Sequence, residues 1–284
     1  MSDLSLIKEL REKTGAGFLD CKNALSENNN DISLSIDSLR KKGLSKANKK
    51  SSREAKEGAV GFYTNENISI ILKINSETDF SAKSDTFLNF LDLIGNIAID
   101  QNNPNLSLEN FMNVKHDHKS ISDLLTEMIA KIGENLIIKE LKVYDNKELN
   151  LNYYIHNPYR KNIGKIVSVV YFSCNELNND IRAFSKNLCM HIAAAKPEAM
   201  DIDQLPPSVI ENEKKIQQEM IKDSGKPSNV MEKILEGKMK KFFSEVTLLN
   251  QNYVIDPDKS INQLMNDFNK LNLFQLKHFD LMSL

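Results

Sequence analysis

Two short motifs contain residue types that could perform chemistry. His116 and His118 stand two residues apart, a spacing that would bring both imidazoles to one face of a strand, where they could bind a metal ion. Cys189 and His191 have the same spacing and could form a nucleophile with its general base. The first pair has no third and fourth ligand nearby, so we interpret it as two exposed loop histidines. In a helix the second pair would diverge by about 200° and could not meet. We therefore predict no metal site and no catalytic residues.

Composition narrows the classes of function. The 284 residues are enough for two or three structural units. With 37 basic and 39 acidic residues, the net charge of −2 argues against a general nucleic-acid binder. Three cysteines without CxxC spacing favour a reducing compartment and disfavour a disulfide framework or a zinc site. No apolar run approaches the ~20 residues of a membrane span, and the polar, acidic N-terminus is unlike a signal peptide. We expect a soluble, cytoplasmic protein without cofactor, membrane or nucleic-acid partner.

The stretch from Asn75 to Lys83 connects a strand to a helix. Before it, apolar residues alternate as in a strand, at Ile68, Ile70, Leu72 and Ile74. After it, the spacing of three and four predicts an amphipathic helix through Phe87, Phe90, Leu91, Ile94 and Ile97. Thr78 or Asp79 would cap that helix. Phe80 lies in this turn, where neither core obviously claims it. Either Phe80 folds back into the local core, or the turn presents its ring to a pocket on a partner.

A second stretch, from Leu10 to Leu25, favours the partner-binding interpretation. It contains Thr14-Gly15-Ala16-Gly17 followed by Asp20-Cys21-Lys22. Together with Glu77-Thr78-Asp79-Phe80 it closely resembles the bacterial elongation factor Ts family, the guanine-nucleotide exchange factors of elongation factor Tu. The runs 131–135 and 191–197 are similar to the same family, and the resemblance extends to about residue 270.

The resemblance implies roles for individual residues. The turn Thr78-Asp79-Phe80-Ser81 would insert near the magnesium site of elongation factor Tu, where Phe80 would enter an apolar pocket between two helices. Further contacts with this GTPase are implied for Thr14, Gly15, Lys22, Ile132, Gly133, His156, Val254 and Ile255. The partner would be bound in its GDP and nucleotide-free forms, and the prediction includes a homodimer or a two-plus-two complex. Two departures from the family pattern are Ser81, where Val is usual, and Asn157-Pro158 after His156.

The predicted fold class is α+β. Residues 3–43 read as three short helices with Gly43 at the end of the third, a module that resembles the ubiquitin-associated fold. From Arg40 to Arg53 there are seven basic residues and no acidic one, which we interpret as a solvated linker. Residues 1–53 would form this module with its linker, and residues 54–143 the N-terminal half of a core with antiparallel sheets.

The C-terminal half of the core is predicted from residues 144–204 and 244–284. A hairpin around a loop at 156–163 and a following helix repeat the pattern of the first half. A second hairpin, over 245–249 and 253–255, a helix capped by Ser260 and a strand over 273–279 complete it. Between them, residues 205–243 predict a helical hairpin, which in the family is an inserted coiled-coil arm. Its apolar stripe would contain Val209, Ile210, Ile216, Met220 and Ile221.

Family members often continue into a further C-terminal helix that contacts the GTPase. Because the chain ends at Leu284, we expect that contact to be missing.

Three classes of function compete. We favour an exchange factor that acts by binding. A ubiquitin-associated or ribosome-associated binding module is the alternative, but it needs only residues 1–53 and leaves most of the chain without a role. An α+β enzyme ranks last, because no P-loop, GxSxG or HExxH motif occurs.

Overall fold

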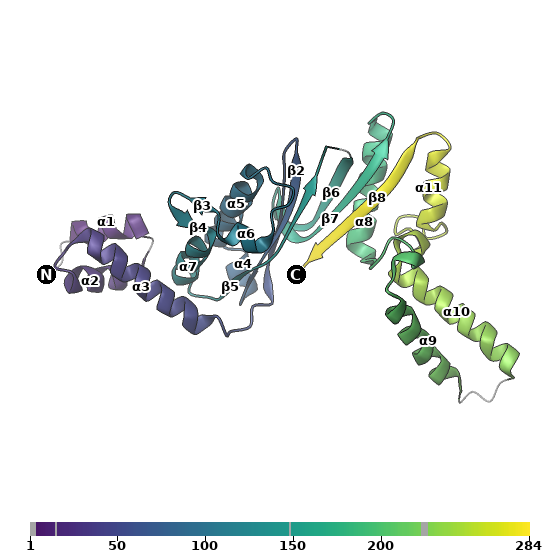
Figure 1. The fold of residues 1–284 in the computed structure, drawn as a ribbon, viewed down its shortest axis with the longest axis horizontal. Coiled ribbons are helices and arrows are strands. Elements are labelled where there is room, and N and C mark those ends of the chain that lie inside the picture. The colour runs from purple at the N-terminus through teal and green to yellow at the C-terminus, as the bar shows by residue number, and fades with distance from the viewer. Residues whose placement is uncertain (1–3, 15, 148, 223–226) are drawn as a thin grey trace. The chain divides into compact units, whose positions relative to one another are not determined.

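The computed structural model describes residues 4–14, 16–147, 149–222 and 227–284 (Figure 1). Helices and antiparallel strands occur together, which confirms the predicted α+β class. By their internal contacts the residues group into two compact units. One comprises Met1–Lys147, Asn157–Ile166 and Met282–Leu284, and the other Glu148–His156 and Val167–Leu281. The four-part division from the sequence stays a prediction.

Three helices open the chain. They are α1 (Leu4–Thr14), α2 (Phe18–Glu27) and α3 (Ile32–Lys50). Their shared core consists of the residues predicted to face inward: Ile7, Leu10, Cys21, Ala24 and Leu25, with Leu6, Ile32, Ile36 and Leu39 packed against them.

The third helix does not end at Gly43, as the sequence predicted. Gly43 is buried against helix α7 (Ile121–Ile132), and a Cβ added there would lie 3.5 Å from the Cβ of Ala130. That distance is an ordinary van der Waals contact, so Gly43 neither ends the helix nor is required for the packing of α3 on α7.

The basic run is largely helix rather than linker, although most of its described basic side chains are exposed, as predicted. Its residues up to Lys50 belong to α3. Arg40 pairs with Asp123 of α7 at 2.8 Å, and Arg53 pairs with Glu77 at 3.5 Å. The acidic partners come from distant segments, so the sequence run alone could not reveal them.

The first unit contains an antiparallel sheet of β1 (Glu57–Thr64), β2 (Ile68–Ser76) and β5 (Leu136–Asp145). In the β1–β2 hairpin Glu57 pairs with Ser76. β2 then pairs with β5, with a register shift between Lys73 and Ile74. The first residues of β7 (Ile163–Cys174) pair with β1 on its other side.

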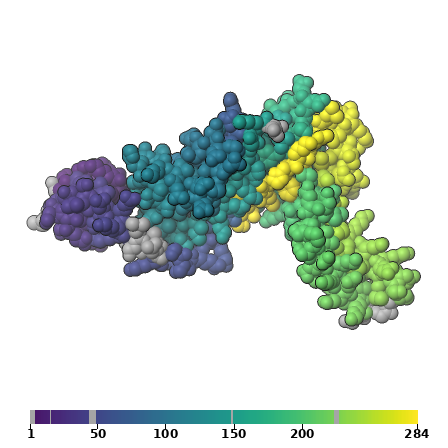
Figure 2. Space-filling view, viewed as in Figure 1, coloured from purple at the N-terminus to yellow at the C-terminus, as the bar shows by residue number. Residues whose placement is uncertain are grey.

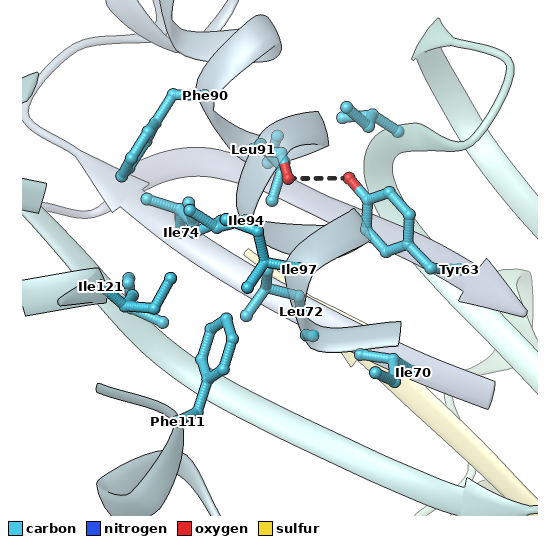
Figure 3. Close-up of a cluster of buried hydrophobic side chains, with 14 of the residues drawn as sticks. Tyr63, Ile70, Leu72, Ile74, Phe90, Leu91, Ile94, Ile97, Phe111 and Ile121 are labelled. Carbon is cyan, nitrogen blue, oxygen red and sulfur yellow. Dashed lines mark hydrogen bonds between the residues drawn. The ribbon is translucent and has the colours of Figure 1, made fainter. Parts of the chain in front are cut away.

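The core of this unit lies between one face of the sheet and the helices α5 (Asp85–Asp100), α6 (Leu108–Met112) and α7 (Figure 3). The alternating isoleucines of β2 face the apolar stripe of α5, as their spacing predicted. The hydroxyl of Tyr63 donates to the carbonyl oxygen of Leu91 at 3.0 Å. Its ring packs against Gly95, where a Cβ would come within 2.2 Å of it.

The two histidines with metal-ligand spacing lie in a small hairpin. Strand β3 (Lys115–His116) pairs with β4 (Lys119–Ser120), so His116 is half-buried at a strand end and His118 is exposed in the turn. Among the residues that the structure describes, no group of three or more His, Cys, Asp or Glu could hold a metal ion.

In the second unit β7 lies between β6 (Asn150–Arg160) and β8 (Phe274–Ser283). Helices α8 (Asn179–Ala195) and α11 (Ile261–Asn269) help to form its core. Phe184 of α8 stacks on Phe268 of α11 at a centroid distance of 4.0 Å.

Two loop predictions for the C-terminal half of the core were wrong. The segment from His156 to Arg160 continues β6, and the turn to β7 is at residues 161–162. Because β6 stands at the end of the strand order, Pro158 is tolerated there. The hairpin predicted over 245–255 is instead the end of a helix followed by a 3-10 turn, Leu248–Asn250, and an isolated bridge between Asn252 and Ser260.

The predicted helical hairpin consists of α9 (Pro207–Lys222) and α10 (Ser228–Val246), which pack together (Figures 1 and 2). Its predicted apolar stripe is only partly correct. Ile216 and Met220 are 42% and 67% exposed. Gln217 instead accepts a hydrogen bond from Lys238 of α10 at 2.8 Å.

No helix in the described part of the chain is long and apolar enough to cross a membrane.

Candidate functional site

The turn after β2 is a single short helix, α4 (Asp79–Ala82). Its aromatic residue, Phe80, points outward. Thr78 caps it, because its Oγ1 accepts a hydrogen bond from the backbone amide of Ser81 at 3.2 Å. Ser81 and Ala82 are buried, whereas Phe80 is 85% exposed. This exposure excludes the interpretation in which Phe80 folds back into the local core.

The C-terminal end of α4 is fastened to the long helix that follows. The hydroxyl of Ser84 donates to the carbonyl oxygen of Ser81 at 2.8 Å and accepts from the amide of Phe87 at 3.3 Å. Since Ser84 is the N-cap of α5, it determines the direction in which α4 enters that helix. The prediction that Thr78 or Asp79 caps the long helix was therefore wrong: Ser84 caps α5, and Thr78 caps the short helix α4.

The connection from α7 to β5 lies against the N-terminal end of α4. Helix α7 ends at Gly133, which has a left-handed backbone with φ 87°. The next residue, Glu134, receives two hydrogen bonds from Thr78: one from its hydroxyl at 2.7 Å and one from its backbone amide at 3.1 Å. The structure therefore brings Ile132 and Gly133, which were predicted as separate contacts, next to the Phe80 turn.

A second carboxylate, that of Glu77, also links the β2–α4 connection to the α7–β5 connection. Here the acid belongs to the β2–α4 connection and the donor to the α7–β5 connection. Glu77 accepts a hydrogen bond from the backbone amide of Asn135 at 2.6 Å and pairs with Arg53. The buried side chain of Asn135 donates to the carbonyl oxygen of Arg53 at 2.7 Å. The residue before the Phe80 turn is thus held by hydrogen bonds to neighbouring segments.

The charged groups next to the exposed Phe80 ring are Asp79 and Lys83 of the same turn. Asp79 pairs with Lys83 one helical turn later at 2.8 Å. The hydrogen bond from Lys83 lowers the pKa of the Asp79 carboxyl. Both side chains are exposed, so an apolar ring stands beside one solvated ion pair.

The predicted N-terminal contacts lie at the end of α1 and within α2. The hydroxyl of Thr14 donates to the carbonyl oxygen of Leu10 at 2.6 Å and accepts from the amide of Ala16 at 3.3 Å, so it shapes the turn. Lys22 is exposed, and Gly15 lies outside the described residues.

Sequence reasoning missed two apolar side chains on this surface. Phe18 and Leu19 are 45% and 68% exposed. The signal for them is their position in the first turn of α2, ahead of the inward-facing residues Cys21, Ala24 and Leu25. Because the two side chains are neighbours, they can contribute to a contiguous apolar surface of the kind that binds proteins.

In the second unit His156 lies on β6 rather than in a loop. Its Nδ1 is 3.2 Å from the hydroxyl of Tyr154. Asn157, directly after it, has a left-handed φ of 49°, so the strand is distorted at this point. The departure from the family pattern at Asn157-Pro158 therefore coincides with a distortion of the strand directly after His156.

Val254 and Ile255 form an exposed tip, with 46% and 59% of their surface open to solvent. A buried histidine that sequence reasoning did not assign to this site supports them. The amide of Val254 donates to Nδ1 of His191 at 3.3 Å. Nε2 of the same ring therefore carries the proton and donates to Oε1 of Gln251 at 2.9 Å. Burial lowers the pKa of His191, which favours this neutral form.

The supposed nucleophile and base have separate partners. The thiol of Cys189 donates to the carbonyl oxygen of Asn152 at 3.2 Å, and burial raises its pKa to about 12. A thiol that stays protonated is a poor nucleophile. What these residues can do is therefore structural, and the exposed Phe80, Phe18 and Val254 are suited to binding another protein.

Comparison with known proteins gives consistent results. A family model described as "Elongation factor TS" matches residues 77–283, starting at the turn that carries Phe80. Elongation factor Ts of Allorhizobium ampelinum is 37% identical over 269 residues, which cover 94% of this chain and 86% of that protein. Elongation factor Ts of Rhizobium meliloti is 36% identical over 266 residues, with the same coverage. Elongation factor Ts of Alkalilimnicola ehrlichii is 38% identical over 263 residues, which cover 92% of this chain and 86% of that protein.

Proposed function

Because the chain belongs to the elongation factor Ts family of translation elongation factors, we propose that it is the guanine-nucleotide exchange factor of elongation factor Tu. It binds the GDP form of this GTPase, disturbs the magnesium and phosphate site and promotes release of GDP, so that GTP can bind. It acts by binding, and none of its residues takes part in covalent chemistry.

The exposure of Phe80 on a supported turn is the observation that carries this proposal. A ring that is 85% exposed loses nearly all of its contact with water when it enters an apolar pocket. Full burial of a Phe contributes roughly 1.5–3 kcal/mol. That is enough to bias a GTPase loop between two conformations but too little to displace a tightly bound nucleotide alone, so other contacts add to it.

Linkage converts this binding into exchange. An exchange protein that binds the magnesium-free GTPase more tightly than the magnesium-bound one lowers the affinity of the GTPase for GDP. GDP lowers the affinity of the GTPase for the exchange protein by the same ratio. The Thr78–Ser81 turn is the part of the chain that we assign to the magnesium site.

The remaining contacts divide into three groups. Ile132 and Gly133 adjoin the Phe80 turn through Glu134. Thr14, Gly15 and Lys22 belong to the N-terminal helices, where the exposed Phe18 and Leu19 extend the apolar surface. In the second unit we assign His156, Val254 and Ile255 to the same partner.

We further propose that the protein works in the cytoplasm and binds both the GDP-bound and the nucleotide-free GTPase. Assembly as a homodimer or as a two-plus-two complex belongs to the same proposal. A ubiquitin-associated or ribosome-associated module without exchange activity is not favoured, because the family match starts at residue 77, beyond the three helices that such a module would need.

The test is release of fluorescent GDP from purified elongation factor Tu. A substoichiometric amount of this protein is expected to accelerate release many-fold, and the acceleration should saturate as the GTPase concentration rises. A release rate equal to the spontaneous rate, from a protein whose circular dichroism shows the expected helices and strands, would refute the proposal.

A further inference from the structure

The turn that presents Phe80 cannot hold its own shape. Helix α4 has four residues, far fewer than the ~12–15 at which an isolated helix becomes even marginally stable in water. Phe80 itself has almost no packing partner, because it is 85% exposed. The direction of the ring therefore depends on groups outside the turn that hold the α4 backbone.

At the N-terminal end of α4 the hydroxyl of Ser76 donates to the carbonyl oxygen of Thr78 at 2.9 Å, and the donors of Thr78 bind one carboxylate. Glu134 accepts hydrogen bonds from the hydroxyl of Thr78 at 2.7 Å and from its amide at 3.1 Å, so both of its oxygens are used. Hydrogen bonds to an ionised carboxylate are stronger than those between neutral groups. The hydroxyl of Thr78 at the same time accepts the amide of Ser81, which aligns the oxygen that caps α4.

Glu134 is itself firmly placed. It follows Gly133 at the end of α7, and Lys50 of α3 donates a hydrogen bond to the carbonyl oxygen of Gly133. On its other side, Asn135 is 2% exposed and bound to Glu77 and Arg53. A carboxylate whose two neighbours are fixed can hold the turn without first becoming ordered itself.

We propose that Glu134 is a positioning residue for nucleotide exchange, which holds the Phe80 turn in its projecting form before the partner arrives. The inference rests on the proposed function, in which Phe80 enters the GTPase. Preorganisation of a binding element reduces the ordering cost of association. Without Glu134 only a fraction of the molecules present the ring correctly at any time, and the apparent affinity falls by that fraction.

The experiment compares full-length Glu134→Ala with the wild type in two measurements. Exchange kinetics on elongation factor Tu with fluorescent GDP give kcat and KM, and hydrogen–deuterium exchange of the free protein reports on the amide of Thr78. We expect kcat/KM to fall about tenfold, with the loss mainly in KM, because the population of the competent turn changes and the contacts made after docking do not. The Thr78 amide should exchange faster in the variant.

Two variants sharpen the result. Glu140→Ala removes a half-buried acid within β5, the strand that follows Glu134, and should leave kcat/KM within twofold. Glu134→Gln keeps the shape of the side chain but only one acceptor oxygen for Thr78, so its kcat/KM should lie between those of the wild type and Glu134→Ala. If Glu134→Ala does not fold, Glu134→Gln decides the question through its kcat/KM and the protection of the Thr78 amide.

The outcomes separate the two proposals. A wild type that does not accelerate GDP release refutes the proposed function. In that case the hydrogen–deuterium exchange rate of the Thr78 amide alone tests whether Glu134 holds the turn. An active wild type with a Glu134→Ala variant within twofold of it overturns the positioning role. The same holds if Glu134→Ala loses activity while the Thr78 amide keeps its protection, or if Glu140→Ala loses as much.

Discussion

Replacement of Phe80 by alanine should impair exchange without destabilising the protein. In the free chain the ring is 85% exposed, so its removal should change the free energy of unfolding by no more than about 0.5 kcal/mol. In the proposed complex the whole ring would be buried, which is worth roughly 1.5–3 kcal/mol. At about 1.4 kcal/mol per factor of ten, kcat/KM should fall between tenfold and somewhat more than a hundredfold.

The assay needs a control that removes an equally exposed apolar side chain elsewhere. Leu271 is 91% exposed in the second unit and has no proposed role, so Leu271→Ala should exchange GDP like the wild type. Urea unfolding of both variants and of the wild type checks that all three are equally stable. A Phe80→Ala protein within twofold of the wild type in kcat/KM would refute the insertion of this ring. Equal losses in both variants would show that exposed apolar area, rather than this position, determines the rate.

Three further predictions concern stability. The hydroxyl of Ser81 is buried and has no hydrogen-bond partner among the described residues, so Ser81→Ala should raise the free energy of unfolding by about 1 kcal/mol in urea titrations; a lower value would mean that the hydroxyl has a partner in solution. Gly95→Ala should destabilise by about 1–3 kcal/mol, because the new methyl group would overlap the Tyr63 ring, and an unchanged melting temperature would contradict that packing. Burial lowers the pKa of His191, so at mildly acidic pH this imidazole binds a proton in the unfolded chain but stays neutral in the folded chain. The stability from this neutral ring is complete above about pH 6.5 and is lost as the pH falls below it. His191→Asn, which keeps an acceptor for the Val254 amide, should lose less stability between pH 7 and pH 5 in thermal melts than the wild type does.

Local patterns in the sequence were sufficient for most elements. The alternating isoleucines of β2 and the apolar spacing of α5 each report one buried face, which is a property of the segment itself. Ser260 was predicted as a helix cap, and it begins a capping box. A cap is read from three or four neighbouring residues, so no tertiary information is needed.

The errors occur where the environment of a residue is determined by contacts with a segment that is distant in the sequence. Gly43 is typical of a helix stop, but α3 continues to Lys50 and Gly43 lies against Ala130 of α7, a contact that the local sequence does not report. The exposure of Phe80 could be proposed from the sequence but not decided, because it depends on what covers the turn. The two bonds from Thr78 to Glu134, 56 residues further along the chain, leave no trace in local composition.

The crossed carboxylates of Glu77 and Glu134 have a consequence for how such chains diversify. Each acid belongs to one connection and binds the backbone of the other, so neither loop can gain or lose a residue without releasing its counterpart. Related chains should therefore inherit both loops as a pair. A chimera that receives one of them from a distant relative should lose order in both, even though all of its side chains come from working proteins.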